Sequence, residues 1–174
     1  MVLRPFQQRD ANAIVRACAD QRVLRYSFME PAMSYDDALR WIESANDGWA
    51  SGRVQFAIEP EAATELVGII GFAVDERKRS AEAFYWLLPE GRGHGLMTQA
   101  LATTADFAFA GGVERLYLLI HPENGASLRV AERCGFTREG LLRSYEPFKG
   151  GRPDLVSWSL LPSDRRSSSR SRGA

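Results

Sequence analysis

Two spacings of apolar residues alternate along the chain, and each predicts a different kind of element. A helical period of about 3.6 residues begins after Asp10 and again after Ser34. Asp10 is expected to cap the first of these helices, and Ser34 with Asp37 forms a variant of the capping box for the second. Short apolar or alternating runs predict strands. In the first half of the chain these strands are expected at 2–6, 54–58, 66–74 and 83–88.

In the second half of the chain, helices and strands follow one another in turn. A helix is expected to end at Phe109, because Gly111 and Gly112 come next and glycine commonly follows a last helical turn. The run 116–120 is apolar throughout, which is typical of a strand buried on both faces. The remaining elements are a short helix over 127–133 capped by Asn124 and an antiparallel pair over 141–145 and 155–160. This order predicts an α/β (α+β) fold with a mixed sheet.

Composition predicts an ordinary globular chain. It has 174 residues, of which 45% are hydrophobic and 25% charged, so one domain is expected over 1–162. Serine and arginine dominate 163–174, which we expect to be a disordered tail. Four arginines against one aspartate give that tail a charge of +3, and the rest of the chain carries −3. A mildly acidic body argues against nucleic acid as a partner.

The cysteines and histidines give no sign of a metal site. Cys18 and Cys134 lie far apart in predicted helices and are expected to be buried free thiols in a reducing compartment. With His94 and His121 as the only histidines, the spacing of a Cys/His site is missing. The sequence has no signal peptide and no apolar run of about 18 residues. We therefore expect a cytoplasmic protein without metal and without a membrane partner.

The segment 86–97 carries the strongest chemical signal. An apolar run ends at Pro89, glycines stand at 91, 93 and 95, and a helix-forming run follows. Glycines let the backbone turn and leave no side chain between the amides and a ligand. The first amides of a helix have no intrahelical partner and lie at the positive end of its dipole. This pattern predicts a phosphate or pyrophosphate site. A dinucleotide fold is excluded, since its third glycine would fall where Leu96 stands.

These residues resemble the GNAT superfamily of acyl-CoA-dependent N-acyltransferases. The family's pyrophosphate loop, Q/R-x-x-G-x-G/A, matches 90–95 with Glu90 in place of the usual Gln or Arg, and Arg92 is expected to supply the cationic side chain instead. Asn124 and Ser127 with Gly135–Phe136 match a second motif, and the segment 139–154 matches a third. Within the family the chain is most similar to the RimJ/RimL branch, which acetylates protein N-termini, and to its relatives that modify small molecules.

The resemblance implies a single GNAT domain with about seven mostly antiparallel strands and about four helices. Its fourth and fifth strands are expected to splay around the pantetheine arm of acetyl-CoA, the co-substrate. Backbone amides near Trp86 to Leu88 would then polarise the thioester carbonyl. Asn124 either holds the arm or only caps its helix, and both roles are open. The implied acyl-CoA-binding residues are Trp86, Leu87, Leu88, Gly91, Arg92, Gly93, His94, Gly95, Leu96, Met97, Asn124, Ser127 and Arg133.

The resemblance also implies the catalytic groups. Glu146 is expected to act as general base or to bind the ammonium form of the acceptor. Ser127 is expected to donate a hydrogen bond to the departing thiolate, and Tyr145 is a second candidate, ranked after Ser127, to donate a proton. An α-amine with a pKa near 8 is partly neutral at pH 7, whereas a lysine near 10.4 is not, so a base matters more for a lysine-like amine. Glu30, Tyr35 and Glu146 are expected to line the acceptor pocket. His94 is expected to face solvent or phosphate, and His121 to be structural.

The function that follows is acetyl transfer from acetyl-CoA directly to a primary amine through a ternary complex. The acceptor is a protein N-terminal α-amine or a small-molecule amine. The chain shows no Cys or Ser set beside a His and an acid that would form a covalent intermediate. Two alternatives stay open: a non-catalytic acyl-CoA-binding module, and a transferase for a larger acyl group such as succinyl. The resemblance also leaves a homodimer open.

Overall fold

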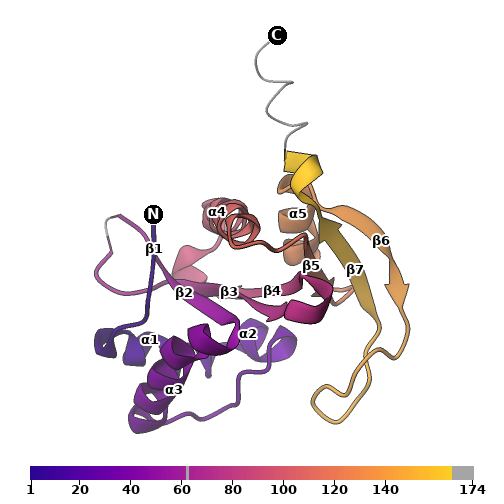
Figure 1. Cartoon of the computed structure of the whole chain (residues 1–174). Coiled ribbons are helices and arrows are strands. Elements are labelled where there is room, and N and C mark those ends of the chain that lie inside the picture. Colours follow the sequence, from indigo (N-terminus) through magenta and orange to yellow (C-terminus); the bar gives the residue numbers. More distant parts are fainter. Residues whose placement is uncertain (62, 166–174) are drawn as a thin grey trace. The chain divides into compact units, whose positions relative to one another are not determined.

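The computed structural model describes residues 1–61 and 63–165, which form a seven-stranded sheet with helices (Figure 1). The strands follow the order β1-β2-β3-β4-β5-β7-β6. The chain divides into two compact units: residues 1–73 with 84–100, and residues 74–83 with 101–174. The division passes through strand β4 (Ser80–Leu87) and helix α4 (Leu96–Ala110).

The first unit packs helices against one face of its strands. Strands β1 (Val2–Arg4), β2 (Arg53–Glu59) and β3 (Gly68–Asp75) pair antiparallel in sequence. Helices α1 (Ala11–Ala17), α2 (Gln21–Tyr26) and α3 (Tyr35–Asp47) lie together on one side of them (Figure 1). Their apolar residues form one buried cluster that includes Phe6, Ile14, Ile42, Ile69 and Trp86. The capping box at Ser34 is confirmed, since Ser34 Oγ accepts the Asp37 amide at 3.1 Å.

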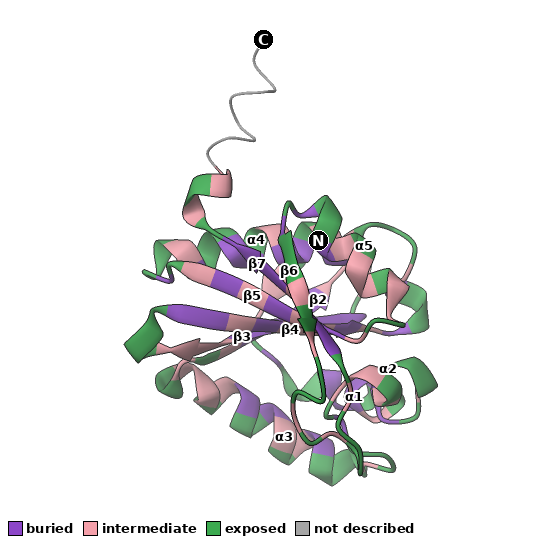
Figure 2. Cartoon of the chain, turned by 90° about the vertical axis from the view of Figure 1, so that its right-hand side faces the viewer, coloured by how far each residue is buried: buried purple, intermediate pink, exposed green. Residues whose placement is uncertain are grey.

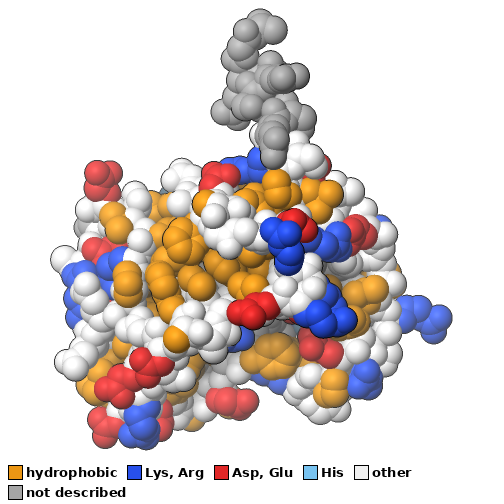
Figure 3. All heavy atoms as spheres, in the orientation of Figure 1, with side chains coloured by type: hydrophobic (Ala, Val, Ile, Leu, Met, Phe, Trp, Pro, Cys, Tyr) orange, Lys and Arg blue, Asp and Glu red, His pale blue; other side chains and the backbone are white. Residues whose placement is uncertain are grey.

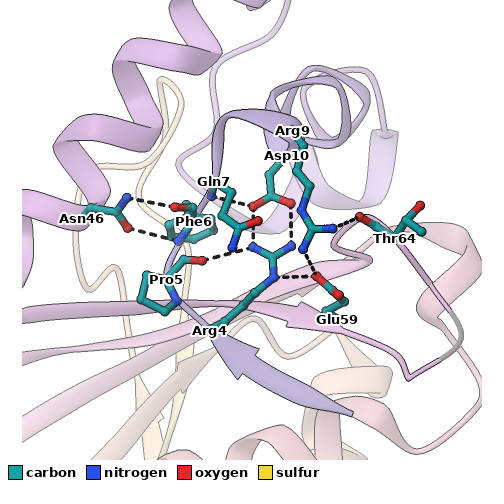
Figure 4. A network of polar contacts seen from close by, with 9 residues as sticks. All are labelled: Arg4, Pro5, Phe6, Gln7, Arg9, Asp10, Asn46, Glu59 and Thr64. Atoms are coloured by element: carbon teal, nitrogen blue, oxygen red, sulfur yellow. Dashed lines mark hydrogen bonds and ion pairs between the residues drawn. The ribbon is translucent and has the colours of Figure 1, made fainter.

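A buried ion pair fixes the start of this unit (Figure 4). Asp10 is fully buried, and its two carboxylate oxygens accept bonds of 2.7 and 2.8 Å from the Arg4 guanidinium. The prediction that Asp10 caps α1 is wrong, because its side chain makes no cap bond to that helix and accepts the Gln7 amide at 2.8 Å instead. Glu59 bridges Arg4 and Arg9. A buried carboxylate needs such a partner, and here the partner ties β1 to the entrance of α1.

The second unit carries the other strands and helix α5 (Gly125–Arg133). Strand β5 (Arg115–Ile120) pairs parallel with β4 from Ser80–Arg115 to Glu82–Tyr117. Strand β7 (Leu155–Leu160) pairs antiparallel with β5 on one side and with β6 (Thr137–Leu142) on the other. Strand β7 is mostly buried and β6 mostly exposed or intermediate (Figure 2).

The prediction that the fifth strand is buried on both faces is wrong. Leu116, Leu118 and Ile120 are buried, but Arg115, Tyr117 and Leu119 between them are partly exposed. On the same face, the Glu139 carboxylate accepts bonds of 2.8 and 2.6 Å from Arg115 and further bonds from Ser157 and Ser159. This face is therefore polar rather than a second apolar core.

Smaller differences from expectation lie at the ends of elements. Helix α2 was not predicted, and several one-turn 3₁₀ helices add to the count. Residues 162–165 form a helical turn in which Arg165 pairs with Asp106, and the rest of the predicted tail, 166–174, lies outside the described residues. Cys18 and Cys134 are buried thiols that form no disulfide, as predicted. In the part of the chain that the structure describes, no helix is long and apolar enough to span a bilayer.

Candidate active site

The glycine loop of the first unit begins where β4 ends. The Leu88 amide donates to the Val67 carbonyl at 2.8 Å, and a 3₁₀ turn follows over Pro89–Gly91. A Cβ on Gly91 would stand 2.9 Å from Val67 Cγ2, so this glycine is needed for close packing. Leu88 was predicted to bind acyl-CoA, but its amide cannot donate to a ligand while it is bonded to Val67.

The next two glycines are needed for backbone shape. Gly93 and Gly95 have φ values of +85° and +73°, and a Cβ on either would meet no atom of the described residues within 4 Å. Helix α4 starts at Leu96, and in its first turn the Gln99 amide donates to the Gly95 carbonyl at 3.1 Å. Among the described residues, no protein acceptor is recorded for the amides from Gly93 to Met97. These donors lie at the positive end of a 15-residue helix, which is an arrangement that favours binding of an anion.

The side chains around this loop have different positions. His94 is exposed, as expected, while the side chains of Met97 and Trp86 are buried, so Met97 can offer only its amide. Among the residues that the structure describes, the buried indole Nε1 of Trp86 has no hydrogen-bond partner. Glu90, the departure from the family motif, pairs with Arg16 at 3.3 Å on the surface, where such a pair adds little stability.

Arg92 has a role that the sequence does not reveal. Its Nε donates to the Leu87 carbonyl at 2.9 Å and its Nη2 to Asp20 Oδ1 at 2.7 Å. Asp20 also accepts the amides of Arg22 and Val23 at the start of α2. Burial raises the pKa of Asp20, but the bonds from Arg92 and the amides outweigh it, so the pKa lies below its ordinary value. Arg92 thus ties α2 to the loop, and its predicted contact with phosphate would compete with this bond.

The second unit carries the Asn124 motif at the start of α5. Asn124 Oδ1 accepts the Ser127 amide at 3.2 Å, which confirms the predicted cap. This bond uses the oxygen and not the Nδ2 group, so capping does not exclude the role in holding the pantetheine arm. Ser127 is partly buried in the first turn, and Arg133 is exposed in the last.

The loop between β6 and β7 holds the remaining predicted groups. The Ser144 amide donates to Asp154 Oδ1 at 2.8 Å and the Tyr145 amide to the Pro153 carbonyl at 3.1 Å, so Asp154 helps to order the loop. Tyr145 is 43% exposed. Glu146 is partly buried, and within the described residues its carboxylate has no recorded hydrogen bond or ion pair. It is therefore open to a proton or an ammonium group.

Two residues near this loop were missed by the sequence reasoning. Tyr117 on β5 donates to Glu82 on β4 at 3.5 Å, and the two stand at the same register of the parallel pair. Burial, followed by the charges of Glu82 and Tyr145, raises the pKa of Tyr117 to about 12. The sequence has no signal for this cluster, because it depends on the register between two strands that lie far apart in the chain.

The last predicted residues, Glu30 and Tyr35, lie in the first unit. Both are exposed, Glu30 in the segment after α2 and Tyr35 at the first position of α3. Across the described ranges, no group of three or more His, Cys, Asp or Glu side chains is arranged to hold a metal ion. Acidic and basic side chains are interspersed over the described part of the face drawn in Figure 3.

Fold and loop together define a mixed α/β protein with a glycine loop and helix entrance after β4 and a capped helix after β5. A family model described as an acetyltransferase (GNAT) domain matches residues 1–137. An uncharacterized N-acetyltransferase of Bacillus subtilis (strain 168), YoaA, is 30% identical over 92% of this chain and 93% of its own length. A spermidine N(1)-acetyltransferase of Vibrio cholerae is 26% identical over 94% of both chains.

A solved structure agrees with these relatives. RimJ of Mycobacterium smegmatis, in complex with a CoA disulfide, has a TM-score of 0.81 and 27% identity, and the match covers 98% of this chain and 88% of that one. The chain belongs to the GNAT acetyltransferase family and is an acyltransferase. Its predicted fold class and RimJ/RimL-like resemblance are confirmed.

Proposed function

We propose that the protein transfers an acetyl group from acetyl-CoA directly to a primary amine. The observation that carries this proposal is the row of unpaired amides from Gly93 to Met97 at the entrance of α4. Coenzyme A carries a diphosphate, which is the kind of anion that such a helix entrance binds. The similar RimJ structure contains a CoA disulfide, which supports the same ligand here.

The chemistry requires a neutral amine, since an ammonium group has no electron pair to attack the thioester. Glu146 is the residue we propose to take that proton, because its carboxylate is partly buried and has no recorded partner in the described chain. Ser127, held in the first turn of α5, is proposed to donate a hydrogen bond to the leaving thiolate. A thiol pKa near 8.5 makes this help modest.

The acceptor class is the finer part of the proposal. Similar proteins carry the names spermidine N(1)-acetyltransferase and ribosomal-protein-serine acetyltransferase, so both small amines and protein N-termini are candidates. A larger donor such as succinyl-CoA, or acyl-CoA binding without transfer, would need the same phosphate site. Assays over several acyl donors separate these alternatives.

The test is release of free thiol from acetyl-CoA in the presence of amines of low and high pKa. Glu146→Gln should lower turnover most for the high-pKa amine, because that amine is almost entirely protonated near pH 7. Glu132→Gln is the matched control, since Glu132 is exposed on α5 and the substitution removes the same charge. Equal losses for both amines would exclude the base role of Glu146. Stabilisation by acetyl-CoA with no thiol release from any amine would favour the binding module.

A further inference from the structure

One face of the strands in the second unit is polar and only partly buried. Tyr117 lies on this face of β5, and Glu82 on β4 is its partner at the last pair of the parallel strands. Alternate residues of β5 point the other way and are buried, so Tyr117 belongs to the partly exposed side. Tyr145 is close enough to Tyr117 to affect its pKa, and we call Glu82, Tyr117 and Tyr145 the acidic cluster of this face; all three are partly exposed to solvent.

Two carboxylates, Glu82 and Asp75, act electrostatically on the Tyr117 hydroxyl. The pKa of Tyr117 is raised first by burial and then by the charges of Glu82, Tyr145 and Asp75. The Tyr117 hydroxyl therefore stays protonated and neutral at physiological pH. The positive charge nearest along β5 belongs to Arg115, two residues before Tyr117. That guanidinium donates a bidentate pair of hydrogen bonds to the Glu139 carboxylate at 2.8 and 2.6 Å, so its positive charge is neutralised by Glu139.

We propose that Glu82, with the hydroxyl groups of Tyr117 and Tyr145, binds a second positive charge of the acceptor and so selects amines that carry more than one cationic group. A carboxylate accepts about four hydrogen bonds and an ammonium group donates three, which suits this arrangement. The inference rests on the proposed function, because it assigns a further group to the same acceptor.

The charge held by Glu82 is not that of the amine that reacts. A carboxylate beside an ammonium group stabilises the protonated form and would delay attack on the thioester. Glu146 directly follows Tyr145 and is the group proposed to remove the proton. The two carboxylates therefore have different roles. Glu146 removes the proton from the reacting amine, and Glu82 binds the distant cationic end of the same molecule.

The experiment compares diaminobutane with aminobutanol, which has the same chain length and a neutral hydroxyl in place of the second amine. The wild-type protein should acetylate the diamine with the higher kcat/KM, by about tenfold or more, as a charge-assisted bond predicts. Glu82→Gln should remove most of that preference by raising KM for the diamine. It should leave kcat/KM for aminobutanol and the KM for acetyl-CoA within about twofold.

Controls separate the outcomes. Glu132→Gln, exposed on α5, should keep the wild-type preference, and Tyr117→Phe should reduce it in part while the ring stays in place. A Glu82→Gln variant that binds CoA normally and keeps the full preference for the diamine would overturn the inference. So would a wild-type protein that acetylates aminobutanol as well as the diamine. A wild-type protein that binds CoA but releases no thiol with any amine would instead contradict the proposed function.

Discussion

Replacing Gly93 with alanine changes the backbone conformation of the glycine loop without disturbing its packing. Gly93 has a φ of +85°, and a Cβ there would meet no atom within 4 Å in the part of the chain that the structure describes. The substitution therefore creates no clash, and its effect on stability comes from the left-handed backbone alone. That conformation costs a residue with a Cβ about 1–2 kcal/mol, offset in part by lower entropy of the unfolded chain. The net loss of about 1 kcal/mol should lower Tm by about 2–4 °C.

Affinity for CoA should fall by more than this strain explains. If the turn at Gly93 aims the amides at the diphosphate, a shifted backbone weakens at least one bond to a charged group. Such a bond is worth about 1.5–3 kcal/mol, which corresponds to a loss of about tenfold to a hundredfold in affinity. Isothermal titration with CoA measures the affinity, and a thermal scan of the same sample measures Tm.

Gly135 provides the matched control. It follows α5 with a φ of +81°, and a Cβ there would also meet nothing within 4 Å. Gly135→Ala should lower Tm about as much as Gly93→Ala but leave the affinity for CoA unchanged. Equal affinities in the two variants would refute the reasoning that the loop at Gly93 binds the diphosphate.

Two further predictions concern stability. Gly91→Ala should lower the free energy of unfolding by about 1–3 kcal/mol in a urea titration, because its Cβ would crowd Val67, and an unchanged midpoint would contradict the packing role. The bonds from Arg115 lower the pKa of Glu139 from 4.5 to about 2, so Glu139 contributes stability above about pH 4.5 that is lost as the pH falls toward 2. Glu139→Gln should therefore be less stable than the wild type at neutral pH and should lose less stability across that window, and urea midpoints with the same slope against pH in both proteins would count against it.

The sequence predicted what depends on local chemistry. The capping box at Ser34, the cap at Asn124 and the glycine bend before α4 each follow from residues a few positions apart. Asp10 was misread for the opposite reason. Its residue type and position suited a helix cap. The Asp10 carboxylate instead accepts hydrogen bonds from Arg4, because the packing of β1 against the start of α1 brings the two residues together.

Contacts between distant segments were beyond the sequence. Arg92 lies 72 residues from Asp20 and Tyr117 lies 35 from Glu82, and no local pattern marks either pair. The apolar run in β5 was read as buried on both faces, although one of its faces carries the polar network around Glu139. The backbone shape of the glycine loop was therefore predictable from the sequence, whereas the contacts of Arg92 and Tyr117 were not.

The central claim is that the amides from Gly93 to Met97 bind the diphosphate of coenzyme A. Hydrogen exchange at these individual amides, followed by NMR with and without saturating CoA, tests it most directly. The account predicts fast exchange in the free protein, because no acceptor is recorded for these amides in the described chain, and strong slowing when CoA is bound. Exchange that stays fast at all of these amides while CoA is demonstrably bound would contradict it.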